Sequence, residues 1–180
     1  MPVRRIHITG ASGSGVSTLG SALAEALGAV QFDTDDFFWM PTEPPFTDKR
    51  PMPERLERLE AALDAADRWV LSGSALGWGE PLVPRFELVV FLYLPPEVRL
   101  ARLLAREQAR YGPRIAPGGD MHAQHLDFMD WCRSYDTATD FSRNLHLHNR
   151  WLEALPCPVL RIEGDPSVEE SLARVLSRPS

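Results

Sequence analysis

The feature that most constrains the fold of this 180-residue chain is a glycine-rich segment near its start, Gly10-Ala11-Ser12-Gly13-Ser14-Gly15-Val16-Ser17-Thr18. A short apolar run precedes the segment, and a stretch rich in alanine and leucine follows it. The spacing is that of the loop G-x-x-x-x-G-K-[ST], which cradles phosphates between a strand and a helix. A strand, a glycine-rich turn and a helix in this order predict an α/β fold.

The residue types in this loop suit an anion. Gly10, Gly13 and Gly15 allow backbone angles that other residues disfavour. Successive N–H groups then face one concavity at the start of the following helix, which favours phosphate binding. Ser17 occupies the position of a Mg²⁺ ligand, and Thr18 is placed to bond an α-phosphate. We therefore predict that residues 10–18 bind ATP with Mg²⁺. A glycine-rich turn without a ligand is the alternative.

One position departs from the pattern. Val16 stands where the pattern has lysine, whose ammonium group reaches the β- and γ-phosphates. Valine offers neither a charge nor a hydrogen-bond donor. Either another cation takes this place, or the site binds nucleotide weakly and does not turn it over. The candidate cations are Lys49, Arg50, Arg102, Arg106, Arg110 and Arg114.

Charge and composition exclude several classes of function. The net charge of −6 argues against a broad nucleic-acid surface. No apolar stretch approaches the ~18 residues of a membrane span. Cys132 and Cys157 lie far apart and have no zinc-site spacing. Because the first residues lack a charged and apolar leader, we expect a cytoplasmic protein with neither nucleic-acid nor membrane partners.

Apolar runs alternate with helical patterns along the chain. The runs predicted as strands are Arg5–Thr9, Ala29–Phe32, Trp69–Ser72, Leu88–Leu94 and Pro158–Ile162. The segments predicted as helices are Ser17–Leu27, Glu54–Ala66, Pro96–Arg110 and Ser167–Leu176. This alternation predicts one domain over residues 1–180, with a doubly wound, three-layer α/β fold around a parallel five-stranded sheet.

Two segments interrupt the alternation. Pro41–Pro53 is rich in proline and is predicted to be an extended loop, whereas Tyr111–Pro156 is predicted to be mostly helical. Both follow the carboxyl ends of predicted strands, where α/β enzymes place segments that cover a substrate. We therefore expect an acceptor and loop segment at about 33–66 and a helical lid at about 106–155.

Three carboxylates follow the second predicted strand. Asp33 and Asp35 would share one face of extended backbone. Carboxylates beside a phosphate loop are suited to hold Mg²⁺ through water or to accept a proton from a substrate hydroxyl. Three aromatic residues after them are suited to line a pocket for a ring. The alternative is a helix cap and a solvated turn, with the aromatic side chains in the core. The segment also contains Asp36, Phe37, Phe38 and Trp39.

Arginines recur at helical spacing after the fourth predicted strand. Such a stripe beside a phosphate loop can clamp phosphates with planar, bidentate donors. The alternative is a solvated basic face paired with glutamates on the same helix. Arg102 and Arg106 are the members that we favour for a functional role. The stripe consists of Arg99, Arg102, Arg106 and Arg110.

Two further features have a functional and a structural interpretation. Trp78, between two glycines, is placed either to stack on an acceptor or to pack against the sheet. His122 and His125 would share a helix face, and together with nearby acidic and histidine residues they are candidates for a metal-binding site. Contacts with substrate and ordinary surface histidines are the alternatives. The candidate set is Asp120, His122, His125, His146 and His148.

These motifs resemble the P-loop group that contains nucleoside monophosphate, shikimate and gluconate kinases. A narrower resemblance is to bacterial adenylate-kinase-like proteins, which share the start Gly10–Gly15, a small residue at the lysine position and a segment like Asp33–Trp39. The resemblance extends over nearly the whole chain. It implies strand order 2-3-1-4-5, a helical lid and nucleotide binding by Gly10–Thr18.

The resemblance also assigns roles to residues outside the loop. It implies substrate or Mg²⁺ contact by Asp33 and Asp35, a glycine after the third strand at Gly73, and lid arginines at Arg102, Arg106 and Arg110. The third strand ends without the acidic residue of many NTPases. Asp33 or Asp35 would therefore supply the carboxylate for the metal.

From these features we expect an ATP-binding, Mg²⁺-dependent protein that transfers the γ-phosphate to a small acceptor, such as a nucleotide, a nucleoside or a sugar-acid-like molecule. Asp33, Asp35, Arg102 and Arg106 are the predicted catalytic residues, and Ser17, Asp33 and Asp35 the predicted metal ligands. The alternative is a nucleotide-binding module that catalyses nothing or hydrolyses ATP slowly. We expect a monomer or a homodimer.

Overall fold

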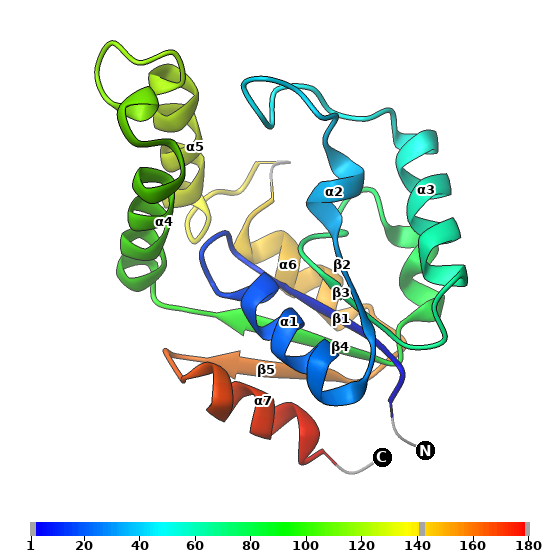
Figure 1. Ribbon diagram of the computed structural model, residues 1–180. Coiled ribbons are helices and arrows are strands. Elements are labelled where there is room, and N and C mark those ends of the chain that lie inside the picture. The colour runs from blue at the N-terminus through cyan, green and yellow to red at the C-terminus, as the bar shows by residue number, and fades with distance from the viewer. Residues whose placement is uncertain (1–2, 141–142, 179–180) are drawn as a thin grey trace.

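A five-stranded parallel sheet organises the computed structural model, which describes residues 3–140 and 143–178 (Figure 1). Within these residues the strand order is β2-β3-β1-β4-β5, as predicted. Each predicted strand agrees with the structure to within one residue at either end. The strands are β1 (Arg5–Gly10), β2 (Val30–Asp33), β3 (Trp69–Ser72), β4 (Leu88–Tyr93) and β5 (Val159–Glu163).

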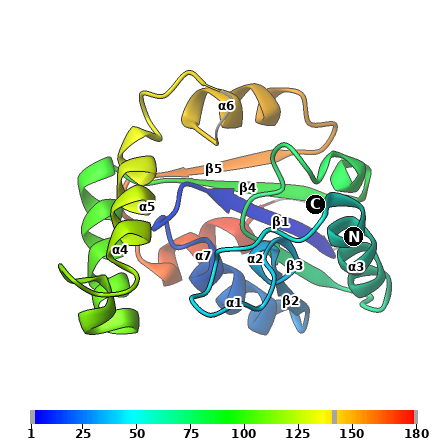
Figure 2. The same cartoon turned by 90° about the horizontal axis from the view of Figure 1, so that it is seen from above.

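Helices cover both faces of the sheet and give the predicted three layers. Figure 2 shows α1 (Val16–Leu27) and α7 (Val168–Leu176) on one face and α6 (Leu145–Glu153) on the other. The helix α3 (Met52–Asp64) and the 3₁₀ turn η1 (Glu80–Arg85) complete the second face. The first core contains Ile6, Ile8, Leu19, Leu23 and Val90, and the second contains Leu63, Trp69, Leu71, Phe91 and Leu152.

The two segments that interrupt the alternation have these boundaries in the structure, and their role as acceptor segment and lid stays a prediction. The helix α4 (Pro96–Tyr111) continues through Tyr111, and the lid consists of the 3₁₀ turn η2 (Gly112–Ile115) and α5 (His122–Ser134). The prediction that Pro53 belongs to the proline-rich loop is wrong. Pro53 lies in the first turn of α3, where the missing N–H of proline costs no helical hydrogen bond. No helix of the described residues is long and apolar enough to cross a bilayer.

Close packing at Gly20 sets the height of α1 above the sheet. A Cβ atom at Gly20 would lie 2.0 Å from Ser72 Oγ and 2.8 Å from Gln31 Nε2, so a side chain here would have to displace both groups. Gln31 Nε2 in turn donates hydrogen bonds to Ser17 O, at 2.9 Å, and to Ser72 Oγ, at 3.2 Å. The first turn of α1 is thereby fixed over the ends of β2 and β3.

We predict that Gly20→Ala destabilises the protein by about 1–3 kcal/mol, the usual cost of overpacking a tight site. Helix propensity alone would favour alanine by about 1 kcal/mol, so a net loss identifies the packing effect. Denaturant unfolding measures the change, with Ser21→Ala on the exposed side of α1 as the control. The double variant Gly20→Ala/Ser72→Ala should regain part of the loss. An unchanged or increased stability of Gly20→Ala would contradict the close approach.

Candidate functional site

The phosphate loop connects β1 to α1 as predicted, and two of its glycines have left-handed backbone conformations. The φ angles of Gly13 and Gly15 are 84° and 88°. A Cβ atom at Gly13 would also lie 2.6 Å from Arg99 O. Gly15 caps α1 without a side-chain hydrogen bond. The first N–H groups of α1, which a helix cannot satisfy internally, are therefore available to an anion.

Ser17 and Asp33 meet at the start of α1. Ser17 Oγ donates a hydrogen bond of 2.6 Å to Asp33 Oδ2. The other carboxylate oxygen, Asp33 Oδ1, accepts a hydrogen bond from the Asp35 backbone N–H at 3.0 Å. Asp33 is thereby held by two neighbours, and its carboxylate faces the hydroxyl that the motif assigns to a metal.

The prediction that Asp33 and Asp35 share a face of extended chain is wrong. Residues 34–38 form a short helix, α2 (Thr34–Phe38), and Asp33 is its N-cap. A carboxylate at this position accepts a backbone N–H bond and complements the helix dipole, which explains the acidic first turn. The alternative of a helix cap, with Phe37 and Phe38 packed against the core, is the observed structure.

The donor atoms around Ser17 fit Mg²⁺. A serine hydroxyl and an aspartate carboxylate are hard oxygen ligands, and Mg²⁺ is usually held by one or two carboxylates with waters and substrate phosphates. Among the described residues no group of three or more histidine, cysteine, aspartate or glutamate side chains is placed to hold a metal. The site therefore suits an ion that arrives with a nucleotide better than one held by protein ligands alone.

Asp35 extends from α2 toward several charges. Desolvation raises the pKa of its carboxyl group above the ordinary value, and the neighbouring charge of Asp33 raises it further. Arg143 and Arg106 lower the same pKa, which places both guanidinium groups within electrostatic reach of Asp35. Gly73, whose φ is 112°, lets the end of β3 approach Thr34 closely and so fixes α2 at this position.

A cavity of about 410 Å³ lies beside the phosphate loop and is large enough for a small ligand. Its walls come from the loop, from α4 and from the turn between β5 and α7. Arg102 and Arg106 both line it, as the predicted functional members of the arginine stripe. Arg102 Nη2 also donates a hydrogen bond of 2.6 Å to Asp165 Oδ1. The loop and turn residues at the cavity are Gly13, Ser14, Gly15, Thr18, Pro166 and Ser167.

The other two arginines of the stripe lie elsewhere. The Arg99 side chain is only 1% exposed, pairs with Asp136 and donates a hydrogen bond of 2.7 Å to Cys132 O. It therefore joins α4 to α5 inside the lid. Arg110 lies over the ring of Tyr111 and does not line the cavity.

Three of the candidate substitutes for the missing lysine are engaged at a distance from the loop. Arg50 donates to Phe37 O, to Trp39 O and to Glu54 Oε1. Lys49 lies over the ring of Phe38, and Arg114 pairs with Glu43 and Asp120. Among the described residues, the cation that touches the loop is one that sequence reasoning missed. Arg143 Nη2 donates a hydrogen bond of 2.7 Å to Ser12 Oγ.

Arg143 precedes α6, at the return from the lid to the sheet. Sequence analysis predicted helix in this region from its apolar residues and noted its histidines. A single arginine does not repeat at a regular spacing, so no pattern singled out Arg143. Asn144 caps α6 by accepting a hydrogen bond from Leu147 N, which marks the start of the helix. That cap places Arg143 at a fixed entry point, but nothing in the sequence shows that the entry faces the phosphate loop.

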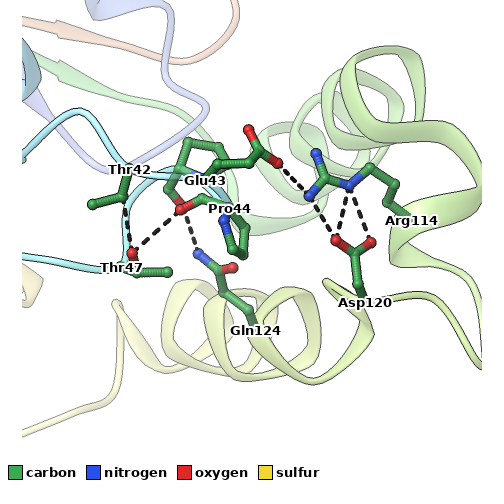
Figure 3. Close-up of polar contacts among 8 residues, drawn as sticks. Thr42, Glu43, Pro44, Thr47, Arg114, Asp120 and Gln124 are labelled. Carbon is green, nitrogen blue, oxygen red and sulfur yellow. Dashed lines mark hydrogen bonds and ion pairs between the residues drawn. The ribbon is translucent and has the colours of Figure 1, made fainter.

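The two covering segments touch each other. Arg114 Nη2 lies 2.5 Å from Glu43 Oε1 and 2.6 Å from Asp120 Oδ2, and Gln124 Nε2 donates a hydrogen bond of 2.9 Å to Pro45 O (Figure 3). Thr47 Oγ1 braces the loop by donating to Pro44 O and to Thr42 Oγ1. Exposed ion pairs contribute only about 0–1 kcal/mol, so this contact is easily opened.

The remaining sequence candidates have structural roles or lie apart. Trp78 is buried in the second core and donates to Ser74 O, which agrees with packing rather than stacking on an acceptor. His148 Nδ1 lies 2.6 Å from the Tyr135 hydroxyl, and burial lowers its pKa to about 3. His122 Nδ1 lies 2.9 Å from Ile115 O, and His125 faces Glu107. These histidines do not converge on one metal position.

Comparison with known proteins agrees with this architecture. Residues 6–124 match the family described as AAA domain. The uncharacterized protein YqaC of Bacillus subtilis (strain 168) is 46% identical over 173 residues, and the match covers 96% of each chain.

Solved structures of similar fold include two shikimate kinases and a sugar kinase, each 20% identical to this chain. The shikimate kinase from Bacteroides thetaiotaomicron has a TM-score of 0.56 and covers 97% of both chains. The sugar kinase from Janibacter sp. has a TM-score of 0.53, with 98% of this chain and 94% of that chain covered. The shikimate kinase from Acinetobacter baumannii in complex with shikimate has a TM-score of 0.52, with 97% and 94% covered. The similarity confirms a P-loop kinase-like fold.

We predict that Asp35→Asn increases the stability of the ligand-free protein at neutral pH. The pKa of Asp35 is raised in the folded state, so the folded protein binds this proton more tightly than the unfolded chain does. Stability therefore falls as the pH rises above the ordinary value of 3.8, and asparagine removes that loss. The gain in melting temperature should shrink as the pH is lowered toward 3.8.

The matched control is Asp130→Asn on α5, whose exposed carboxylate pairs with Arg133 and should give no gain. A lower melting temperature of Asp35→Asn at neutral pH would show that Asp35 is a stabilising residue rather than a charge held in place for a ligand.

Proposed function

The chain belongs to the AAA-domain family of P-loop proteins, and we propose that it transfers the γ-phosphate of ATP to a hydroxyl group of a small acceptor. The observation that carries the proposal is the 2.6 Å contact of Ser17 with Asp33 at the start of α1, with Asp35 beside it. This arrangement joins a hydroxyl suited to a nucleotide-bound metal, a fixed carboxylate and a second carboxylate in one place.

The cavity and the phosphate loop together provide a binding position for the nucleotide. Its base and ribose fit the cavity between α4 and the turn that leads into α7, where Arg102 and Arg106 supply positive charge. Its phosphates follow the loop at the N-terminus of α1. Ser17 and Asp33 would hold Mg²⁺, which supplies neutralisation of phosphate charge when it is bound.

The transfer itself needs few protein groups. The acceptor oxygen forms a bond to the γ-phosphorus, the bond from that phosphorus to the β-phosphate bridging oxygen breaks, and ADP leaves. The acceptor proton passes to the Asp35 carboxylate, whose raised pKa brings it closer to working pH than an ordinary aspartate. Arg106 lies within electrostatic reach to offset charge that develops on the transferred group.

The acceptor would bind between α2 and the lid, beside the Asp35 carboxylate and where the loop of residues 40–50 meets α5. A closable contact here would exclude water from the reacting phosphate. The solved kinases of similar fold are named for shikimate and for sugar. That supports a small acceptor with hydroxyl groups, and nucleotides, nucleosides and sugar acids are the classes to test.

A second function is favoured by one observation. Val16 packs in the first apolar core and is 9% exposed, so the loop carries no charge at the lysine position. Such a loop suits a module that binds nucleotide and does not turn it over.

An assay of ADP release with ATP and Mg²⁺ distinguishes these functions. Phosphoryl transfer predicts release that depends on one acceptor in a panel of nucleosides, nucleotides and sugar acids. Release that is slow and independent of the acceptor would indicate hydrolysis only. Tight ATP binding without any release would contradict the proposed transfer and favour the binding module.

We further predict that Ser17→Ala and Asp33→Asn weaken binding of Mg²⁺–ATP by roughly 10- to 100-fold, the usual cost of disturbing a metal site. Binding of ATP in the presence of a chelator should change much less, because both side chains act on the metal. Isothermal titration measures both affinities, and Ser21→Ala on the exposed side of α1 is the matched control. Equal losses with and without Mg²⁺ would overturn the assignment of these residues to the metal.

A further inference from the structure

The loop lacks a charge that its ligand requires. Val16 points into the apolar core among residues such as Ile8 and Leu19, and its side chain has no group that could meet a phosphate. The β- and γ-phosphates of a nucleotide carry most of the negative charge that the site must hold. Backbone N–H groups and Mg²⁺ offset part of it, and the usual lysine offsets more.

Arg143 places a guanidinium group against this loop. Its Nη2 donates a hydrogen bond of 2.7 Å to Ser12 Oγ, and its Cζ lies over the ring of Trp131, 4.7 Å from the ring centroid. These two contacts hold the guanidinium group beside the loop. Ser12, Arg99, Trp131, Cys132 and Tyr135 pack closely around the guanidinium and leave no cavity large enough for a water molecule.

This guanidinium lacks a close counter-ion in the part of the chain that the structure describes. None of the ion pairs found there includes Arg143, and its Nε is buried without a hydrogen-bond partner. Desolvation lowers the pKa of Arg143, while the more distant Asp35 carboxylate raises it. A desolvated charge with an unused buried donor is costly unless an anion joins it. The unpartnered Nε, together with the missing counter-ion, therefore indicates an anionic ligand.

The position along the loop identifies which part of the ligand meets Arg143. The large cavity touches the loop at Gly13, Gly15 and Thr18, whereas Ser12 lies outside that cavity and contacts Arg143. A nucleotide whose base occupies the cavity runs its phosphate chain from the Thr18 side toward Ser12. The terminal phosphate then reaches the Arg143 guanidinium. The Asp35 carboxylate, which would take the proton of the acceptor hydroxyl, lies nearby.

We propose that Arg143 replaces the missing loop lysine and binds the terminal phosphate of a nucleoside triphosphate through its guanidinium group. The inference rests on the proposed function, because it assigns the charge that the same site lacks. The replacement differs from lysine in one respect. The charge comes from the segment that follows the lid, so lid position and phosphate binding are coupled through one side chain.

The test compares affinities for AMP, ADP and a non-hydrolysable ATP analogue in wild type, Arg143→Met, Arg143→Lys and the control Arg133→Met, an exposed arginine on α5. Methionine should weaken binding of the ATP analogue by roughly 10- to 100-fold, the range for a lost charged hydrogen bond, and AMP binding by less than about 3-fold. Arg143→Lys should retain an intermediate affinity, because it keeps the charge and loses the fork.

A charge exchange makes the test independent of folding defects. Val16→Lys/Arg143→Met returns the lysine to the loop and should regain at least about 10-fold of the affinity lost in Arg143→Met, within the same range for a charged hydrogen bond. Val16→Lys alone should give no gain, because two cations then compete for one phosphate. Each variant is checked by thermal unfolding before titration.

The outcomes separate this inference from the proposed function. If wild type binds the ATP analogue and Arg143→Met binds it equally well, Arg143 is not the substitute cation, while nucleotide binding stands. If Arg143→Met loses AMP and the ATP analogue to the same extent, its role is structural and the inference is overturned. If wild type binds none of the three nucleotides, the proposed function fails and the inference fails with it.

Discussion

The close approach of α1 to the sheet at Gly20 is the constraint on which the site depends. With no side chain at Gly20, the helix lies against Ser72 and Gln31, and Gln31 holds the first turn through Ser17 O. The Ser17 hydroxyl then reaches Asp33, which is also the N-cap of α2. One contact between helix and sheet therefore positions the phosphate loop, the Ser17–Asp33 hydrogen bond and the short helix that carries Asp35.

The same geometry explains how the chain can lack the loop lysine. The position of Val16 faces the apolar core in this structure, and valine there adds to the packing of α1. With valine at this position, the phosphate loop lacks the positive charge that lysine usually supplies. A cation from the segment that follows the lid contacts the loop at Ser12 instead. Packing and charge are thereby supplied by different segments.

Much of the fold could be predicted because it depends on local pattern. Continuous apolar runs mark buried parallel strands, and the loop motif fixes the order of strand, turn and helix. The position of Ser17 in the first turn of α1 could be predicted for the same reason. The helix α2 was given only as the alternative, because its five residues, with two acids and two aromatic side chains, are too few to show a helical period.

Arg143 was missed for a different reason. Its role depends on a contact across 131 residues of sequence with Ser12, which no local pattern encodes. For Trp78 the sequence left stacking and packing open, and the structure places its ring in the second core. Contacts of this kind depend on the path that the connecting segments take over the sheet. Neither local propensity nor residue spacing predicts that path.

The most direct test is a crystal structure with Mg²⁺ and a non-hydrolysable ATP analogue. We predict the phosphates along residues 10–18, Mg²⁺ between Ser17, Asp33 and the phosphates, and the Arg143 guanidinium on the terminal phosphate. A nucleotide bound away from the loop would contradict the assignment of the site. A nucleotide in the loop with Arg143 turned away and Lys49, Arg50 or another cation on the phosphates would contradict the substitution of the lysine by Arg143.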